Sequence, residues 1–315
     1  MGFSWDGESL QFETLGSGTA VESDVILTNR HVVVNDGKQV DFILLCPAKA
    51  KTTQAVQCNI PAAVMALHPT LDAALIRPLD PEVTFRPVRR ITHDPVIGTS
   101  IRIEGFPIQT EDFGKFGSEK TISVINHWLK NGGVLEAKGD PLTISRGRIE
   151  RIGRLKTETE NFGRFFWTDV KANFGNSGGA AFDGLRRFIG MPTLRDQEYN
   201  AFVLAIPQLE PWIETVDRTI PQLPPVIQKF YEQQLEKKTL AQSLKAQSVD
   251  YEQKTFSKRW TRKTSPKKRY EQPELFEKEE AVAEETPLLE NQTTIFRQNS
   301  KRVLSPGLLH QMYFQ

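Results

Sequence analysis

The feature of this chain that most limits its fold is a series of short apolar segments ending near residue 220. Gly, Pro, Asn or Asp residues separate each segment from the next, and the series closes with a short predicted helix over 207–216. Short β-branched and aromatic runs between turn residues are typical of strands. Seven or more strands in about 220 residues favour an all-β fold, either an antiparallel sandwich or a pair of small barrels. The expected strands are Val25–Thr28, Val40–Leu45, Ala73–Ile76, Ser100–Gly105, Leu142–Ile152, Phe165–Val170 and Ala201–Ile206.

The composition agrees with a globular β-rich domain followed by a polar extension. The 315 residues are 38% hydrophobic and include 21 Gly and 19 Pro, which is enough apolar material for one large domain or two ordinary ones. Because 40 Lys and Arg nearly balance 39 Asp and Glu, the overall charge gives no reason to expect a nucleic-acid or membrane partner. No segment approaches the roughly 18 consecutive apolar residues of a membrane-spanning helix, so we expect no transmembrane segment.

The start of the chain has neither the basic nor the apolar part of a secretory signal, which predicts a cytoplasmic protein. The two cysteines, Cys46 and Cys58, are spaced so that they can pair across a hairpin in an oxidising compartment. Without an export signal, two reduced thiols are the favoured interpretation. No Cys/His cluster has metal-ligand spacing, so we expect neither a metal site nor an organic cofactor.

The composition changes after residue 220, where we place the end of a first domain, 1–220. Pro221, Pro224 and Pro225 interrupt the chain there. Apolar residues then recur at near-helical spacing among Gln, Glu and Lys, which predicts a helix within 221–248.

The remainder, 249–315, contains two opposed charge blocks. Residues 249–270 carry eight Lys or Arg against two acidic residues, and residues 271–290 carry eight Glu against one Lys. Such blocks with few apolar anchors indicate a disordered or regulatory tail. Aromatic residues within a basic block also occur in single-strand nucleic-acid binding. The adjacent acidic block favours a solvated segment instead, so we do not expect nucleic acid and expect a regulatory partner to bind through 221–315.

Three motifs carry residues with catalytic chemistry. His31 follows an apolar strand, Asp72 stands at the start of another, and Ser177 lies among glycines. Taken singly, they also fit a structural histidine, a turn aspartate and a Gly-rich turn. A serine hydroxyl becomes nucleophilic when a neutral histidine removes its proton, and an aspartate on the other ring nitrogen fixes the tautomer. Together the motifs therefore predict a catalytic triad.

With these motifs the chain resembles a trypsin-like (chymotrypsin-fold) serine protease over about residues 8–217, and most closely its high-temperature-requirement (Deg-type) branch. The resemblance implies two six-stranded antiparallel barrels followed by a short helix, with the site between the barrels. It depends on Gly16-Ser17-Gly18, Leu27-Thr28-Asn29-Arg30-His31-Val32, Asp72-Ala73-Ala74-Leu75, Thr168-Asp169, Gly175-Asn176-Ser177-Gly178-Gly179 and Ala205-Ile206-Pro207.

The resemblance also implies a role for each site residue. Ser177 attacks the carbonyl of a protein or peptide substrate, His31 acts as general base and then general acid, and Asp72 orients His31. The backbone N–H groups of Gly175 and Ser177 form the oxyanion hole. The expected activity is that of a serine endopeptidase, a hydrolase working through an acyl-enzyme without a cofactor.

Specificity has two interpretations at this stage. Lys171 precedes Ser177 by six residues, a position that in this fold often lies near the base of the specificity pocket. A lysine pointing inward favours an acidic side chain before the scissile bond. Alternatively, Lys171 reaches solvent, and a pocket lined near Gly190, Met191 and Ala205 takes small or apolar side chains.

The chain departs from the family in several places. Val32, not Cys, directly follows His31, and the chain has no activation-cleavage terminus and no apparent PDZ-like domain, which favours a regulated intracellular protease without a secreted zymogen step. Residues 111–140 resemble an insertion, either at the rim of the cleft or as a long surface loop. Two other functions remain open: a non-catalytic barrel that binds peptides or partner proteins, and a viral or host-defence protease with one dedicated target.

Overall fold

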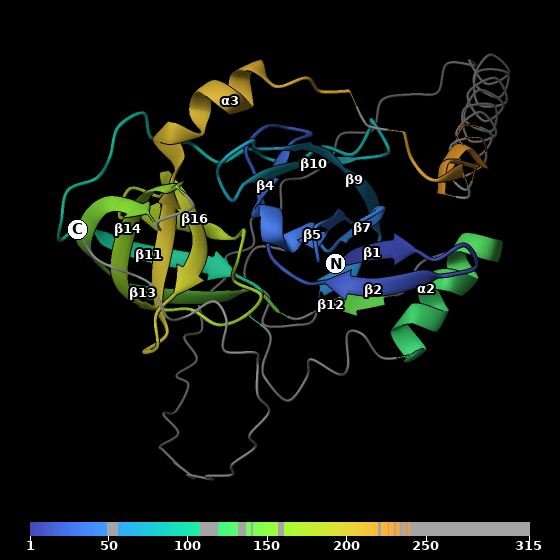
Figure 1. The fold of residues 1–315 in the computed structure, drawn as a ribbon, viewed down its shortest axis with the longest axis horizontal. Coiled ribbons are helices and arrows are strands. Elements are labelled where there is room, and N and C mark those ends of the chain that lie inside the picture. The colour runs from blue at the N-terminus through green and yellow to red at the C-terminus, as the bar shows by residue number, and fades with distance from the viewer. Residues whose placement is uncertain are drawn as a thin grey trace, which may run out of the picture. The chain divides into compact units, whose positions relative to one another are not determined.

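The computed structural model describes residues 1–48, 56–107, 119–131, 137–139, 141–156 and 161–219, together with 222–225, 227–229, 231–233, 236 and 239. These residues belong to one unit that ends at Thr239. Strands make up most of its regular structure and helices are few, which confirms the mostly β prediction (Figure 1). The charged tail predicted over 249–315 lies outside the described residues.

Six strands of the second half close into an antiparallel barrel in the order β11-β13-β14-β17-β16-β15 (Figure 1). In the first of these strands Ile101 and Ile103 are buried while Arg102 and Glu104 are only half-buried, the period-2 pattern of a strand with one face inside. The barrel predicted for this half is confirmed. Its strands are β11 (Ser100–Gly105), β13 (Thr143–Lys156), β14 (Asn161–Lys171), β15 (Ala180–Asp183), β16 (Phe188–Arg195) and β17 (Asn200–Ala205).

The first half forms a seven-stranded antiparallel sheet in the order β2-β1-β7-β9-β10-β4-β3. The closed six-stranded barrel expected for this half is not seen, because the described residues show no pairing between the end strands β2 and β3. The strands are β1 (Gly2–Trp5), β2 (Leu10–Thr14), β3 (Thr19–Ala20), β4 (Ile26–Thr28), β7 (Phe42–Leu45), β9 (Ile60–Leu67) and β10 (Ala74–Pro78). Two small ribbons accompany them, β5 (Val34–Asn35) with β6 (Lys38–Gln39) and β8 (Val56–Cys58) with β12 (Ala137–Gly139).

The segment between β2 and β3 bonds to other parts of the molecule, which accounts for the open edge. Thr14 Oγ1 donates to the carbonyl oxygen of Val32 at 2.6 Å, and the Ser17 N–H donates to the carbonyl oxygen of Ser177 at 2.7 Å. The first bond uses the side chain of Thr14 at the end of β2, whereas the Ser17 N–H is a backbone group that is then not available for a strand ladder. The open edge therefore connects the two halves of the unit.

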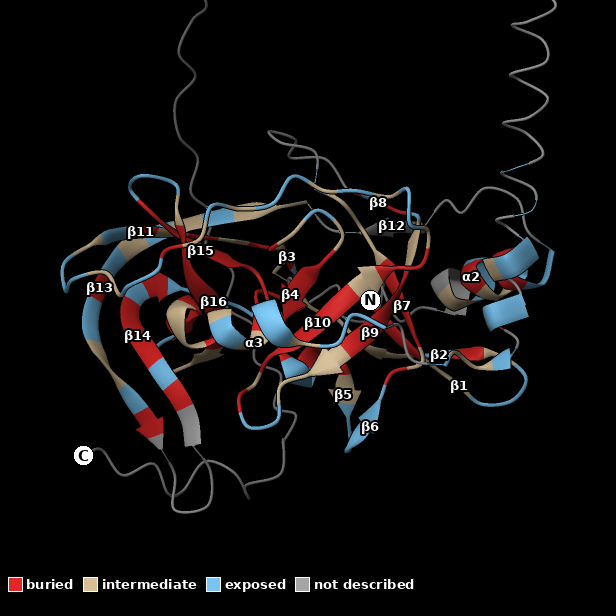
Figure 2. Cartoon of the chain, turned by 90° about the horizontal axis from the view of Figure 1, so that it is seen from above, coloured by how far each residue is buried: buried red, intermediate tan, exposed pale blue. Residues whose placement is uncertain are grey.

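The two halves share one apolar core. Leu27, Leu71 and Leu75 of the first half belong to the same buried cluster as Phe166 and Ile206 of the second. Figure 2 shows the buried residues running along β9, β10, β14 and β16. Burial of a large apolar side chain stabilises a fold by about 1.5–3 kcal/mol, so this cluster holds the halves together as well as filling the barrel.

A helix occupies the region expected to be an insertion. α2 (Glu119–Asn131) buries Ile125, Trp128 and Leu129 in a cluster with Leu10 of β2. Asn126 Oδ1 also accepts the N–H of Leu10 at 2.8 Å. A surface loop is therefore the wrong description of this part of the insertion, since α2 packs against the first-half sheet (Figure 1).

The end of the unit is helical, as expected. A short 3-10 turn, η2 (Ile206–Gln208), leads into α3 (Glu210–Thr215), which has proline in its first turn and buries Ile213. Further on, the described residues between 225 and 239 are helical, and Ile227 is fully buried in the first-half cluster. None of the described helices is long and apolar enough to cross a bilayer.

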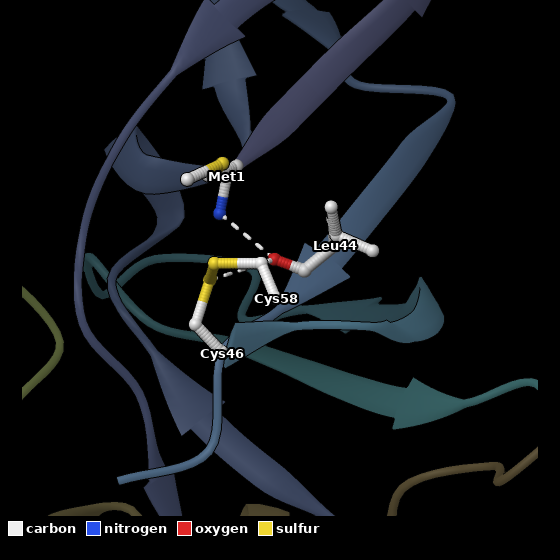
Figure 3. The surroundings of a disulfide bond; sticks show 4 residues. All are labelled: Met1, Leu44, Cys46 and Cys58. Atoms are coloured by element: carbon white, nitrogen blue, oxygen red, sulfur yellow. Dashed lines mark hydrogen bonds between the residues drawn. A yellow bond between two sulfur atoms is a disulfide. The ribbon is translucent and has the colours of Figure 1, made fainter. Parts of the chain in front are cut away.

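Cys46 and Cys58 form a disulfide, so the expectation of two reduced thiols is wrong. Cys46 directly follows β7 and Cys58 ends β8, and their Cα atoms lie 3.9 Å apart. Figure 3 shows the bridge beside the amino group of Met1, which donates to the carbonyl oxygen of Leu44 at 3.2 Å. The spacing of the two cysteines is compatible with this pairing, whereas the lack of an export signal favoured reduced thiols.

Candidate active site

His31 lies on a single 3-10 turn, η1 (Arg30–Val32), that begins just after β4 ends. The pairing of β4 with β10 stops at Thr28, so the chain leaves the sheet there and carries the imidazole to the surface. The His31 side chain is 46% exposed. The ring is therefore accessible to a substrate.

Asp72 lies in the turn between β9 and β10 and contacts His31 through both carboxylate oxygens. Oδ2 lies 2.6 Å from His31 Nδ1, and Oδ1 accepts the backbone N–H of His31 at 3.0 Å. The Asp72 side chain is 18% exposed, so water screens this contact only partly. A carboxylate on Nδ1 leaves Nε2 as the nitrogen that can accept a proton. The structure thus brings together two of the three predicted triad residues.

The His68 imidazole holds the turn that carries Asp72. Its Nδ1 accepts the backbone N–H groups of Thr70 at 3.2 Å and Leu71 at 2.9 Å, and its ring meets Trp212 edge to face. Burial lowers the pKa of His68 below its ordinary value, which favours the neutral form needed to accept these bonds. His68 has no role in the sequence prediction.

Ser177 stands in a tight loop between β14 and β15 that requires glycine at two positions. The backbone φ is 88° at Gly175 and 84° at Gly178, in the region that side chains disfavour. A Cβ added to Gly178 would lie only 2.1 Å from the carbonyl oxygen of Ser17. The predicted glycine-rich context of Ser177 therefore has a definite structural cause.

Ser17 fixes the Ser177 loop from the first half of the unit. In addition to its backbone bond to Ser177, its Oγ donates to the carbonyl oxygen of Gly175 at 2.6 Å and accepts the N–H of Phe106 at 2.9 Å. Thr28 Oγ1 in turn donates to the carbonyl oxygen of Ser17 at 2.7 Å. Ser17 is only 5% exposed, so these bonds are shielded from water. The bond to Gly175 fixes the peptide group between Gly175 and Asn176, inside the serine motif.

Asn29 connects the His31 and Asp72 segments to the barrel. Its buried Nδ2 donates to the backbone oxygen of Asp72 at 2.8 Å and to Thr193 Oγ1 on β16 at 2.9 Å. The N–H of Gly178 donates to the Pro192 carbonyl on the same strand at 3.1 Å. All three motifs are thus tied into one network. Sequence reasoning missed Ser17, Asn29 and Thr193 as positioning residues, although the first two lie inside the motifs.

The described residues offer no hydrogen-bond partner to the Ser177 hydroxyl, the His31 ring included. Bonds between nucleophile and base are often long without substrate and shorten when it binds. Within the same residues, the backbone N–H groups of Gly175 and Ser177 have no acceptor. A hydroxyl and two N–H donors on one rigid loop are suited to attack a carbonyl and to bind the oxyanion that forms.

The four predicted pocket residues occupy two different environments. Lys171 lies at the surface, where Nζ donates to the Glu198 carbonyl at 2.8 Å and to Asn200 Oδ1 at 2.7 Å. By contrast, Gly190, Met191 and Ala205 are buried, and Gly190 pairs with Ala205 across β16 and β17. Their role in specificity stays a prediction.

A cavity of about 420 Å³ lies next to the segment that carries Ser17. Apolar side chains of the first half, among them Ile26, Val32 and Ile43, form much of its lining. None of the three predicted triad residues is part of this lining. In the described part of the chain, no group of three or more His, Cys, Asp or Glu residues is arranged to hold a metal ion.

Comparison with known proteins identifies a family model that covers this site. A model described as the trypsin-like peptidase domain matches residues 16–191, more than half of the chain. No curated protein matches. Among solved structures, the chain is similar to the Rv3671c protease of M. tuberculosis in its active form, with 17% identity over 67% of this chain and 76% of that chain and a TM-score of 0.45. For the inactive form the identity is 17%, the coverage 64% and 83%, and the TM-score 0.42.

Proposed function

The chain belongs to the trypsin-like peptidase domain family, whose model matches residues 16–191, and we propose that it is a serine endopeptidase with His31, Asp72 and Ser177 as its catalytic residues. The observation that carries the proposal is the 2.6 Å contact between His31 Nδ1 and Asp72 Oδ2. Such a contact is the arrangement that a general base for a serine nucleophile requires.

In the proposed reaction, His31 Nε2 removes the proton of the Ser177 hydroxyl as its oxygen attacks the peptide carbonyl. Asp72 stabilises the imidazolium that forms, and the ring then gives the proton to the leaving amine. His31 then removes a proton from water as the water oxygen attacks the acyl-enzyme, and it gives this proton to the Ser177 oxygen. The step releases the acid and restores Ser177.

The backbone N–H groups of Gly175 and Ser177 bind the oxyanion in this proposal. One such donor contributes about 2.7–4 kcal/mol to transition-state stabilisation. The two Ser17 bonds, to the Gly175 carbonyl and to the Ser177 carbonyl, support the assignment because they hold the loop that carries both donors, and donors that are already oriented need no reorganisation during the reaction.

Three finer proposals accompany the activity: membership of the Deg-type branch, regulation through 221–315 and a cytoplasmic location. The motif residues around His31 and Ser177 support the first, and the charge blocks after residue 248 support the second. The third is weakened by the Cys46–Cys58 disulfide, because cytosolic thiols are normally kept reduced.

The proposal is tested by incubating the purified chain with an unbiased peptide library and identifying the products by mass spectrometry. We expect cleavage by the wild type and none above background by Ser177→Ala or His31→Ala. The matched control is Ser100→Ala, which alters an exposed serine at the start of β11. Cleavage that survives Ser177→Ala would contradict the proposal, and binding of peptides without any cleavage would favour the non-catalytic barrel.

A further inference from the structure

A cation and two aromatic rings form an exposed cluster beside the Ser177 loop. The guanidinium carbon of Arg195 lies over the ring of Phe174, 4.2 Å from its centroid, and over the ring of Tyr199, 4.4 Å from its centroid. Phe174 is 51% and Tyr199 50% exposed, and both belong to the few large hydrophobic side chains that the described surface exposes this far. We call these three residues the Arg195 cluster.

The Arg195 cluster adjoins the proposed nucleophile through the backbone. Phe174 immediately precedes Gly175 and lies three residues before Ser177. Arg195 ends β16, the strand that accepts the Gly178 N–H through its Pro192 carbonyl. A peptide whose scissile carbonyl lies at Ser177 therefore passes close to this guanidinium.

The described residues supply Arg195 with no carboxylate partner, and its guanidinium contacts aromatic rings instead. Asp196, its neighbour in sequence, instead accepts the backbone N–H groups of Glu198 at 2.9 Å and Asn200 at 2.8 Å. By contrast, the described residues include the ion pairs of Arg77 with Asp24, Arg90 with Glu210, Arg102 with Glu104, Arg164 with Asp94, Arg187 with Asp183 and Arg218 with Glu22.

The chemistry of the cluster identifies its ligand. Aromatic rings under a guanidinium hold it by cation–π attraction and restrict its orientation. The N–H donors lie in the guanidinium plane, at its edge, and match the two oxygens of a carboxylate. An unpaired and orientated guanidinium beside a peptide-binding site is thus suited to an acidic side chain.

We propose that Arg195 is a specificity-determining residue that selects peptide substrates with Asp or Glu near the scissile bond. The inference depends on the proposed endopeptidase activity and assigns the substrate class of the same site. It transfers the acidic preference from Lys171 to Arg195, because the Lys171 ammonium already donates to the Glu198 carbonyl and the Asn200 side chain.

The test uses the full chain and pairs of peptides, called twins, that differ only in having Glu or Gln at one position. This position is varied over the four residues on each side of a cleavage site. At one position we expect kcat/KM for Glu to exceed that for Gln by about 10- to 100-fold, the range of a hydrogen bond between charged groups. Arg195→Gln should bring this ratio to about one, and Arg195→Glu should make Lys the preferred residue there. Phe174→Leu and Tyr199→Leu should each reduce the ratio, because the guanidinium loses one of its rings.

Lys171→Gln is the matched control, since it removes a cation that already donates to the Glu198 carbonyl and to Asn200 Oδ1; the ratio should stay within about twofold of the wild type. Equal cleavage of Glu and Gln twins at every position by the wild type would overturn the inference while leaving the endopeptidase proposal intact. The inference would also be overturned if Lys171→Gln abolished the Glu-to-Gln ratio of kcat/KM and Arg195→Gln preserved it. If the wild type cleaves no peptide and a fluorophosphonate does not label it, both proposals fail.

Discussion

The Asp72 carboxylate holds His31 at two points, with Oδ2 on the ring at 2.6 Å and Oδ1 on the backbone N–H at 3.0 Å. The first contact selects the tautomer and the second fixes the peptide that carries the ring. Because both oxygens are used by one residue, the position of Asp72 determines the position of the imidazole. Replacement of this side chain should therefore affect catalysis more than folding.

Asp72→Asn should lower kcat by about 10⁴-fold, the loss expected when an amide replaces the carboxylate of a triad. Asparagine keeps the size and one oxygen, but it stabilises neither the required tautomer nor the imidazolium. Steady-state kinetics on a cleaved library peptide provides the measurement. Asp24→Asn, which removes a surface ion pair with Arg77, is the control and should change kcat by less than about twofold. Comparable activity of the two variants would contradict the assigned role.

Ser17→Ala should reduce both stability and activity. The variant leaves the Gly175 carbonyl and the Phe106 N–H without their partner, and an unsatisfied buried group costs about 1–3 kcal/mol. Urea unfolding measures the loss in free energy of unfolding. The kcat/KM of the variant, measured without urea where it is folded, shows the effect on the Ser177 loop. Thr215→Ala is the control, since it removes an exposed hydroxyl that donates to the Pro211 carbonyl. Full activity of Ser17→Ala would show that this bond does not hold the Ser177 loop in its active conformation.

Acid should loosen the Asp72 turn through His68. Its pKa is lowered in the fold by burial, so between the folded pKa and the ordinary value of about 6.5 the unfolded chain binds more protons. The stability from neutral His68 is therefore complete above about pH 6.5 and is lost as the pH falls through the lowered folded pKa. His68→Gln should flatten the dependence of Tm on pH over this interval. Identical profiles for wild type and His68→Gln would contradict the role of His68.

Removal of the disulfide should destabilise the first half. Cross-linking two residues 12 apart restricts the unfolded chain, and a loop of about 15 residues corresponds to about 3 kcal/mol. The double variant Cys46→Ser/Cys58→Ser should lose about this free energy of unfolding, and a reductant should lower the stability of the wild type but not of the variant. Alkylation of both cysteines in the unreduced denatured protein would contradict the bridge.

The local motifs were sufficient to predict much of this molecule. The contact between His31 and Asp72 was expected because an aspartate at the start of a buried strand needs a partner and the three motifs together predict a triad. In the structure the pairing of β4 with β10 brings the two segments together. The short alternating segments such as Ser100–Gly105 predicted strands of a sandwich or of small barrels, and the resemblance to the trypsin-like fold implied the second-half barrel. The terminal helix was predicted over 207–216, and in the structure Pro211 lies in its first turn, where proline is favourable.

Other features depend on contacts that no local pattern specifies. The Ser17 bond to Gly175 joins residues 158 apart in sequence, and the open edge of the first-half sheet results from such bonds. The disulfide was missed because the expectation of reduced thiols depended on a predicted cytoplasmic location and not on the spacing of the two cysteines. α2 was detectable, since Ile122, Ile125 and Leu129 follow one another at helical spacing, but the surrounding Gly-rich segment suggested a loop.

The central claim is that Ser177 is the activated nucleophile. A fluorophosphonate reacts with serines activated in this way, so the chain should be labelled once, and digestion followed by mass spectrometry should place the adduct on Ser177. Labelling should disappear in Ser177→Ala and fall strongly in His31→Ala, with Ser100→Ala labelled like the wild type. A wild-type chain that folds but stays unlabelled, or an adduct mapped to another serine, would contradict the account.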